Sequence, residues 1–107
     1  MSEFSFIGKG VEIYTWENCP YCQRAKNIMN GTDAECCLEN GEYVEFIEHK
    51  IDGDAQERED MVRRCEGHST VPQILIDGEL VGGCFDLVAM IDTGTFREKF
   101  TKYIRRR

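Results

Sequence analysis

Two cysteines separated by two residues constrain this chain more than any other feature of its sequence. The motif Cys19-Pro20-Tyr21-Cys22 directly follows an apolar, β-prone run, Val11 to Thr15, and directly precedes a segment with helical periodicity. Cys19 is therefore expected at a turn from a strand into a helix. The unpaired N–H groups and the positive dipole end of such a helix favour the thiolate of Cys19, which is the nucleophilic form. Pro20 fits the first helical turn, where a missing N–H costs nothing.

The spacing of the two cysteines also indicates how they act together. Cys22 lies one helical turn beyond Cys19, close enough for the two sulfurs to close a small disulfide ring. A Cys-x-x-Cys motif at the start of a βαβ pattern in a small chain is typical of a redox-active pair. Half of a zinc site and a structural disulfide remain as alternatives when the motif is considered by itself.

The length and charge of the chain exclude several classes of protein. Its 107 residues are enough for one core without disulfides, so residues 1–107 are expected to form a single domain. The 13 Lys and Arg residues against 20 Asp and Glu residues give a formal net charge of −7, which argues against a nucleic-acid partner. No apolar run approaches the roughly 18 residues of a membrane span, and residues 1–10 do not resemble a signal peptide. We therefore expect a cytoplasmic protein with no membrane partner, whose six cysteines are mostly reduced.

The remaining pattern predicts an α/β chain, with an N-terminal arm at residues 1–10 and an extended acidic loop at 31–42. The predicted strands are Val11–Thr15, Tyr43–Ile47, Ile74–Ile76 and Leu80–Val81, the last two joined by the hairpin signal Asp77-Gly78. The first predicted helix runs from Pro20 to about Asn30, and the third from Phe85 to Ile91. The second begins at Asp54, and its inner face is formed by Ala55, Met61, Val62 and Cys65. A last helix is predicted along Phe96, Phe100, Tyr103 and Ile104, with Arg105 to Arg107 as its solvated end. With right-handed crossovers, the order β-α-β-α-β-β-α is that of a thioredoxin-like fold, a four-stranded mixed sheet flanked by helices.

The acidic loop carries an adjacent pair of cysteines, Cys36 and Cys37. Neighbouring cysteines rarely bridge each other or share a metal, so we interpret them as ordinary loop residues. We expect no resident metal in this chain.

Three separated blocks of the sequence resemble the dithiol glutaredoxins in order and spacing. They are Val11 to Lys26 with the Cys-Pro-Tyr-Cys motif, then Thr70-Val71-Pro72, then Gly82-Gly83-Cys84-Phe85-Asp86-Leu87. The resemblance covers about residues 11–91. It implies a glutathione-dependent thiol–disulfide oxidoreductase that reduces protein disulfides and mixed disulfides of proteins with glutathione.

The resemblance also implies roles for individual residues. Cys19 would attack the mixed disulfide and take up the glutathione, and Cys22 would resolve mixed disulfides with protein substrates. Pro72, by resemblance a cis-proline, would turn the backbone of Val71 outward to pair with extended glutathione like an added strand. Asp86 and the N–H groups at the start of the third helix would hold the γ-glutamyl end. The residues implied to bind glutathione, the reducing co-substrate, are Tyr21, Thr70, Val71, Pro72, Gly83, Cys84, Phe85 and Asp86.

Two positions depart from the family pattern, and both concern the affinity for glutathione. Trp16 stands where family members usually carry a lysine, and His68-Ser69 stands where they often carry an arginine. Two other functions remain open. One is a carrier of a [2Fe–2S] cluster that two copies share through Cys19 and glutathione, and the other is a dedicated electron donor to ribonucleotide reductase, fed by thioredoxin reductase. We expect a monomer whose partners are glutathione and disulfide or glutathionylated proteins.

Overall fold

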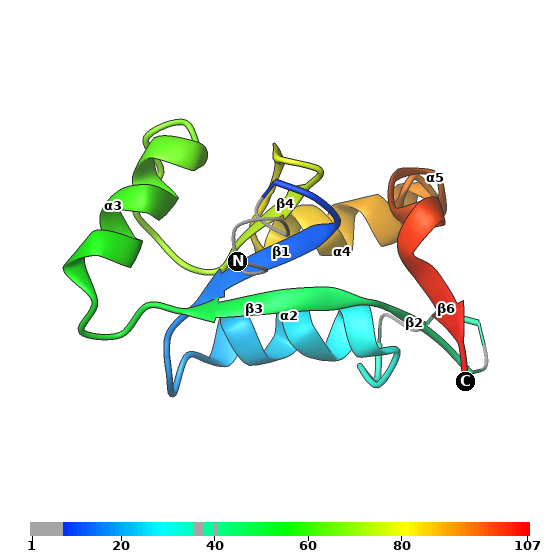
Figure 1. The fold of residues 1–107 in the computed structure, drawn as a ribbon. Coiled ribbons are helices and arrows are strands. Elements are labelled where there is room, and N and C mark those ends of the chain that lie inside the picture. The colour runs from blue at the N-terminus through cyan, green and yellow to red at the C-terminus, as the bar shows by residue number, and fades with distance from the viewer. Residues whose placement is uncertain (1–7, 36–37, 40) are drawn as a thin grey trace.

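The computed structural model describes residues 8–35, 38–39 and 41–107, which form a central sheet with helices on both faces (Figure 1). The strands are β1 (Val11–Thr15), β2 (Glu42–Val44), β3 (Phe46–Lys50), β4 (Gln73–Ile76), β5 (Glu79–Gly82) and β6 (Ile104–Arg106). The helices are α2 (Pro20–Asn30), α3 (Ala55–Arg64), α4 (Cys84–Thr93) and α5 (Phe96–Phe100), followed by the 3₁₀ helix η1 (Thr101–Tyr103). Cys36, Cys37 and the first seven residues of the predicted N-terminal arm lie outside the described residues.

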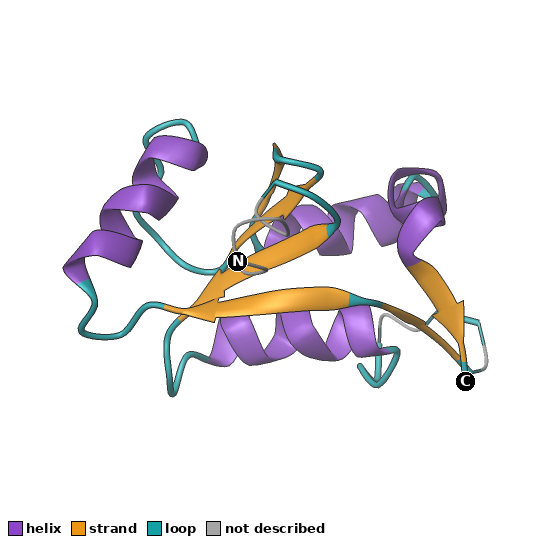
Figure 2. Ribbon diagram, viewed as in Figure 1, coloured by secondary structure: helices purple, strands orange, loops and turns teal. Residues whose placement is uncertain are grey.

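The main sheet has four strands in the order β3-β1-β4-β5 (Figure 2). Strand β3 runs parallel to β1, whereas β4 is antiparallel to both β1 and β5. A parallel pair needs a long crossover connection, which here contains helix α2. Asp77 and Gly78 close the β4–β5 hairpin with φ values of 51° and 85°, as a two-residue hairpin turn requires. The predicted thioredoxin-like mixed sheet is confirmed.

Side chains alternate along β1 and divide the core into two layers. Val11 and Ile13 pack in one cluster with α2, α4 and α5. Tyr14 packs in a second cluster with Met61 and Cys65 at the end of α3. Figure 1 accordingly shows α3 on one side of the sheet and α2 on the other. The cysteine motif at the start of α2 therefore lies at one edge of the first layer.

The predicted strand at residues 43–47 is wrong in one respect, because it is two strands. Glu45 is exposed and separates β2, which lies outside the main sheet, from β3, which pairs with β1. The backbone N–H of Glu45 donates instead to the carbonyl oxygen of Tyr103 at 3.0 Å. Val44 is buried and Phe46 packs against the same cluster. The alternation of residues 43–47 cannot reveal this break, since it depends on a distant carbonyl.

The predicted C-terminal helix also ends earlier than expected. Helix α5 stops at Phe100, and Ile104–Arg106 form β6, which pairs antiparallel with β2 in a second, two-stranded sheet. Phe96 and Phe100 are buried and stacked on each other, as their spacing predicts. Tyr103 and Ile104 continue the same spacing but contact the core from a 3₁₀ helix and a strand. Spacing alone does not distinguish these conformations over so few residues.

The three C-terminal arginines are not the end of a helix as we predicted, because Arg105 and Arg106 belong to β6, but Arg106 and Arg107 are exposed to solvent as expected. All three arginines also make ion pairs or hydrogen bonds. Arg106 pairs with buried Glu42 at 3.4 Å, and Arg105 pairs with Glu45 at 3.2 Å. Arg107 donates to the backbone oxygen of Asn30 at 3.0 Å, at the far end of α2. These contacts hold the chain end against β2 and α2.

Helix α3 begins as predicted, but its inner face is smaller. The Asp54 side chain caps it by accepting a hydrogen bond from the Glu57 N–H at 3.0 Å. Met61 and Cys65 are buried as expected, whereas Ala55 is exposed, because the first turn of the helix extends beyond the sheet. Within the part of the chain that the structure describes, no helix is long and apolar enough to cross a membrane.

Candidate active site

A short turn delivers Cys19 to the start of α2. After β1 ends at Thr15, the backbone N–H of Glu17 donates to both carboxylate oxygens of Asp52, at 2.9 Å each. Asn18 then adopts φ 55°, in the left-handed region that asparagine tolerates better than most residues. The turn is thus fixed by a neighbouring loop and places Cys19 directly before the helix.

Cys19 is the N-cap residue of α2. Its sulfur accepts a hydrogen bond from the backbone N–H of Cys22 at 3.2 Å, in the way that a serine or aspartate oxygen caps other helices. Its carbonyl oxygen accepts from the N–H of Gln23 at 3.0 Å and starts the helical ladder. Pro20 occupies the first turn, as expected. The Cys19 sulfur therefore lies where the free N–H groups of the helix converge.

The two cysteines occupy different environments. Cys19 is partly exposed, whereas Cys22 is only 1% exposed and lies on the buried side of the first turn of α2. Burial, helped by a hydrogen bond to Cys19, raises the pKa of the Cys22 thiol to about 12. Cys22 is thus a protonated thiol at neutral pH. The structure brings the predicted pair together and makes the two sulfurs unequal.

A cleft of about 310 Å³ adjoins the motif on the side of α4. The peptide bond between Val71 and Pro72 is cis, as the resemblance implies. Pro72 is buried, and Val71 lies just ahead of the β4 ladder, which starts at Gln73. All eight residues that the sequence predicts to bind glutathione line this cleft, namely Tyr21, Thr70, Val71, Pro72, Gly83, Cys84, Phe85 and Asp86.

The start of α4 forms one end of this cleft. Gly83 is the N-cap residue, and its N–H donates to the Asp86 carboxylate at 2.8 Å. Asp86 therefore caps the helix while it lines the cleft, so both the structural and the binding interpretations of this residue fit its position. Cys84 borders the cleft, but its side chain is buried in the core cluster. Only its backbone is suited to contact a ligand.

Two exposed aromatic rings form the rim between the motif and α4. Tyr21 and Phe85 are 54% and 68% exposed, although both are large and apolar. Their ring centroids lie 5.3 Å apart at an interplanar angle of 55°. Aromatic rings that are neither buried nor scattered usually mark a surface that binds something.

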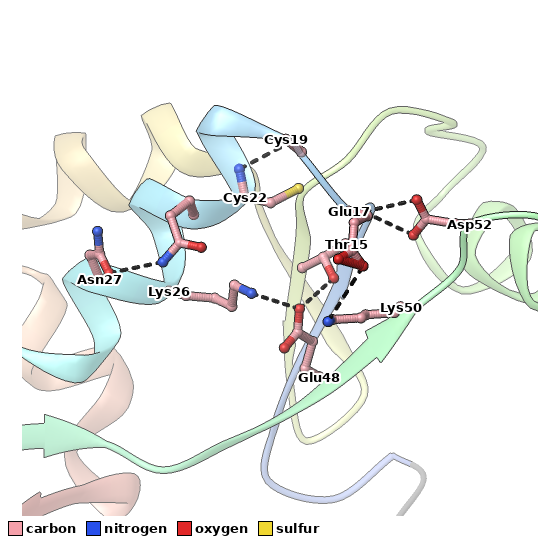
Figure 3. A network of polar contacts seen from close by, with 10 residues as sticks. Thr15, Glu17, Cys19, Cys22, Lys26, Asn27, Glu48, Lys50 and Asp52 are labelled. Atoms are coloured by element: carbon pink, nitrogen blue, oxygen red, sulfur yellow. Dashed lines mark hydrogen bonds and ion pairs between the residues drawn. The ribbon is translucent and has the colours of Figure 1, made fainter.

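A second cleft, of about 450 Å³, lies on the other side of Cys19. Trp16, Cys19 and Cys22 line it together with Lys26 and Lys50. Figure 3 shows Cys22 and Lys26 projecting from α2 toward the strands that carry Thr15 and Glu48. Trp16 thus borders this second cleft, and its ring also lies 5.6 Å from the guanidinium of Arg58.

Comparison with known proteins agrees with this geometry, because the family model for glutaredoxin matches residues 11–81. The chain belongs to the glutaredoxin family. It is similar to Glutaredoxin 3 of Escherichia coli K12, with 48% identity over 80 residues, which are 75% of this chain and 83% of the relative. It therefore has the general activity of the family, thiol–disulfide exchange.

Solved structures of glutaredoxins share the fold. The solution structure of glutaredoxin from Brucella melitensis is 36% identical, with a TM-score of 0.64, and the match covers 86% of this chain and 88% of that one. A crystal structure of the buckwheat glutaredoxin–glutathione complex gives a TM-score of 0.67 at 19% identity, covering 86% of this chain and 76% of that one. At that identity the buckwheat protein supports the fold alone.

Several residues around this glutaredoxin site were not among the predicted site residues. Gln73 and Leu80 line the first cleft, and Lys26 lines the second; Gly82 and His68 also line the first cleft, at positions that the resemblance already singled out. The period-two spacing of Val71 and Gln73 would have indicated Gln73, and the four-residue spacing of Cys22 and Lys26 would have indicated Lys26. Leu80 lies on β5, which pairs with β4, and nothing in the local sequence indicates that it reaches the cleft.

Proposed function

We propose that this glutaredoxin is a glutathione-dependent oxidoreductase in which Cys19 is the nucleophile and Cys22 the resolving thiol. The observation that carries the proposal is the inequality of the two sulfurs. Cys19 is partly exposed and held at the helix N-terminus, so it can reach a disulfide from outside. Cys22 is buried with a raised pKa, so it reacts only with a sulfur that already lies beside it.

Glutathione would occupy the first cleft in an extended conformation. Val71 stands outside the β4 ladder, so its backbone groups are suited to pair with a peptide as an added strand. The first turn of α4 offers backbone N–H groups to a carboxylate, as helix N-termini do. The Asp86 carboxylate at the same end would take the ammonium of the γ-glutamyl group. The zwitterionic γ-glutamyl end and the extended backbone of glutathione would thus each meet a complementary group in the cleft.

The reaction follows from these positions. Cys19 attacks the glutathione sulfur of a mixed disulfide, forms a disulfide with glutathione, and releases the substrate protein as a thiolate that takes up a proton. A second glutathione then attacks this disulfide, leaves with the first as glutathione disulfide, and restores Cys19. With a protein disulfide, Cys19 joins to the substrate instead, and Cys22 releases it by closing the Cys19–Cys22 ring. Two glutathione molecules reduce that ring.

Protein substrates would contact the exposed aromatic rim. Tyr21 belongs to the first turn of α2, next to Cys19, and Phe85 to the first turn of α4, and both line the first cleft. A protein whose disulfide reaches Cys19 would therefore contact one or both rings. Burying a fully exposed side chain of this size contributes about 1.5–3 kcal/mol, and covering these partly exposed rings contributes less than that. The rim therefore adds affinity without selecting one substrate sequence.

Activity with two reductants tests the proposal. We expect turnover of a glutathionylated peptide with glutathione and glutathione reductase, and little turnover when thioredoxin reductase replaces them. The reverse result would overturn the glutathione dependence and favour a dedicated reductant fed by thioredoxin reductase.

Two serine variants test the division of roles. Cys19→Ser should abolish turnover of the glutathionylated peptide, whereas Cys22→Ser should keep much of it, because glutathione can serve as the second thiol. Loss of activity in both variants to the same extent would show that the route needs both cysteines throughout.

A further inference from the structure

Lys26 shares one face of α2 with the resolving cysteine. The two residues are four positions apart, so their side chains lie one above the other on the helix. Both line the second cleft, and Figure 3 shows both projecting toward β1 and β3. Lys26 is thus a cation on the same side of the helix as the buried sulfur.

A carboxylate and a hydroxyl hold this cation in place. The Lys26 ammonium lies 2.9 Å from Glu48 Oε2, and Thr15 Oγ1 donates to the same oxygen at 2.6 Å. Thr15 is fully buried on β1, so its hydroxyl fixes the carboxylate on the neighbouring strand. Partial burial raises the pKa of Glu48, but the hydrogen bonds from Thr15 and Lys26 outweigh it and lower the pKa below its ordinary value. Glu48 therefore stays anionic and holds the Lys26 ammonium on the side of α2 that faces β1 and β3.

The resolving step creates a need for such a cation. Cys22 must lose its proton when it attacks, yet burial disfavours a thiolate at this position. The hydrogen bond with Cys19 also disfavours it, whereas a hydrogen bond from the Trp16 backbone and the positive charge of Lys26 favour it. Two further charged residues line this cleft, Lys50 on β3 and Glu17 in the turn, and they pair with each other at 3.7 Å. Glu48 on β3 contacts Lys26 but does not line the cleft.

We propose that Lys26, anchored by Glu48 and Thr15, is a positioning residue for the resolving step and stabilises the negative charge that develops on the Cys22 sulfur. In this step a bond forms between the Cys22 and Cys19 sulfurs, and the bond from Cys19 to the bound thiol breaks. The Cys22 proton ends on the thiolate that leaves, so no further oxidant or reductant is needed. The inference rests on the proposed function, since it requires Cys22 to be the resolving thiol.

A single-turnover measurement isolates this step. The protein is loaded with glutathione on Cys19, and closure of the Cys19–Cys22 ring is followed by mass spectrometry of the released glutathione between pH 6 and pH 9. We expect Lys26→Met to slow closure about tenfold at pH 7 and to move the rise of the rate to higher pH. Lys26→Arg should stay within threefold of the parent, because it keeps the charge.

Two controls separate a specific role from a structural one. Lys50→Met removes a cation from the same cleft whose partner is Glu17, and it should leave closure within twofold. In a Cys22→Ser background, Lys26→Met should leave turnover of a glutathionylated peptide unchanged, since that route does not use the resolving step. The inference would be overturned if Lys26→Met closed the ring at the parent rate with the parent pH profile. It would also be overturned if, in the Cys22→Ser background, Lys26→Met slowed turnover of the glutathionylated peptide as much as it slows ring closure. A parent protein that fails to close the ring would instead overturn the role proposed for Cys22.

Discussion

The two faces of the β1–β3 pair each carry a charge cluster next to a buried cysteine. On the α3 face, Glu12 of β1 lies 2.9 Å from His49 of β3 and 2.7 Å from Arg64, and Cys65 is buried in the same layer. On the α2 face, Thr15 and Glu48 meet Lys26, and Cys22 is the buried thiol. Alternation along β1 and β3 therefore places a charge cluster on each face of this pair of strands, and the helix that covers each face brings a buried cysteine beside it.

The difference between the faces lies in what surrounds each thiol. Cys65 packs among Tyr14, Met61 and other apolar side chains, and burial raises its pKa to about 11. Cys22 is equally buried, but its N–H is hydrogen-bonded to a second cysteine sulfur and it borders a cleft. A buried thiol near a cation is thus not enough for exchange chemistry. A neighbouring sulfur that reaches the surface turns the α2 face into a candidate active site, and the α3 face remains a structural unit.

The largest expected effect comes from breaking the cluster on the α3 face. Arg64→Met leaves the Glu12 carboxylate, which is 1% exposed, without its strongest partner. Breaking a buried ion pair in this way costs about 3 kcal/mol, so the free energy of unfolding in urea should fall by that amount. Turnover per folded molecule should change less than twofold. Arg63→Met, at an exposed neighbouring position, is the matched control and should change stability by less than about 0.5 kcal/mol; equal stability of the two variants would contradict the structural role of Glu12.

Acid titration tests the same cluster without removing Arg64. Burial raises the pKa of Glu12, but hydrogen bonds from His49 and Arg64 and the charge of Arg64 outweigh it and lower the pKa to about 2. Since the folded-state value lies below the ordinary value of 4.5, the pairing contributes fully above about pH 4.5 and is lost as the pH falls toward about 2. The free energy of unfolding of the parent should therefore drop over this window, and Glu12→Gln should show a shallower drop. Identical slopes would mean that the lowered pKa of Glu42, Glu48 and Asp77 accounts for all acid sensitivity.

Alkylation compares the thiols of the two faces directly. With iodoacetamide at pH 8, we expect Cys19 to react at least tenfold faster than Cys22 and Cys65, because both buried thiols have raised pKa values. Peptide mass spectrometry gives the rate at each position. The difference should disappear in concentrated urea. A fast reaction of Cys65 in the folded protein would show that the α3 face opens to solvent.

The smallest expected effect is that of Lys26→Met on stability. The Lys26 and Glu48 side chains are 20% and 24% exposed, and partly exposed ion pairs contribute little. The free energy of unfolding should fall by about 0.5 kcal/mol or less, measured in urea beside Arg64→Met. A loss as large as that of Arg64→Met would make the two clusters equivalent and would remove the contrast between them.

The sequence predicted which residues gather around the first cleft better than it predicted the edges of the fold. Three short motifs each specify a local backbone conformation, and they identified the residues around the first cleft. They are the cysteine motif, Thr70-Val71-Pro72 and the glycine-rich start of α4. Strand β6 and the break at Glu45 depend on contacts between segments about sixty residues apart, such as the hydrogen bond from Glu45 to Tyr103. The link from Lys26 to Glu48 likewise joins α2 to β3. Local periodicity does not contain such pairings.

The sulfur cap of α2 connects the redox cycle to the order of the helix. In the reduced protein, Cys19 Sγ accepts the N–H of Cys22. An N-cap made by a Ser, Thr, Asp or Asn oxygen stabilises a helix by about 1 kcal/mol, and a sulfur cap contributes less because sulfur is a weaker acceptor. In a mixed disulfide the Cys19 sulfur is bonded to a second sulfur and cannot be a thiolate, so we expect it to accept this hydrogen bond less well and the first turn of α2 to loosen while the substrate is attached. Closing the ring then replaces the lost cap with a covalent link. We therefore expect the rate at which the Cys22 amide proton exchanges with solvent to change through the redox cycle and to be highest in the mixed disulfide.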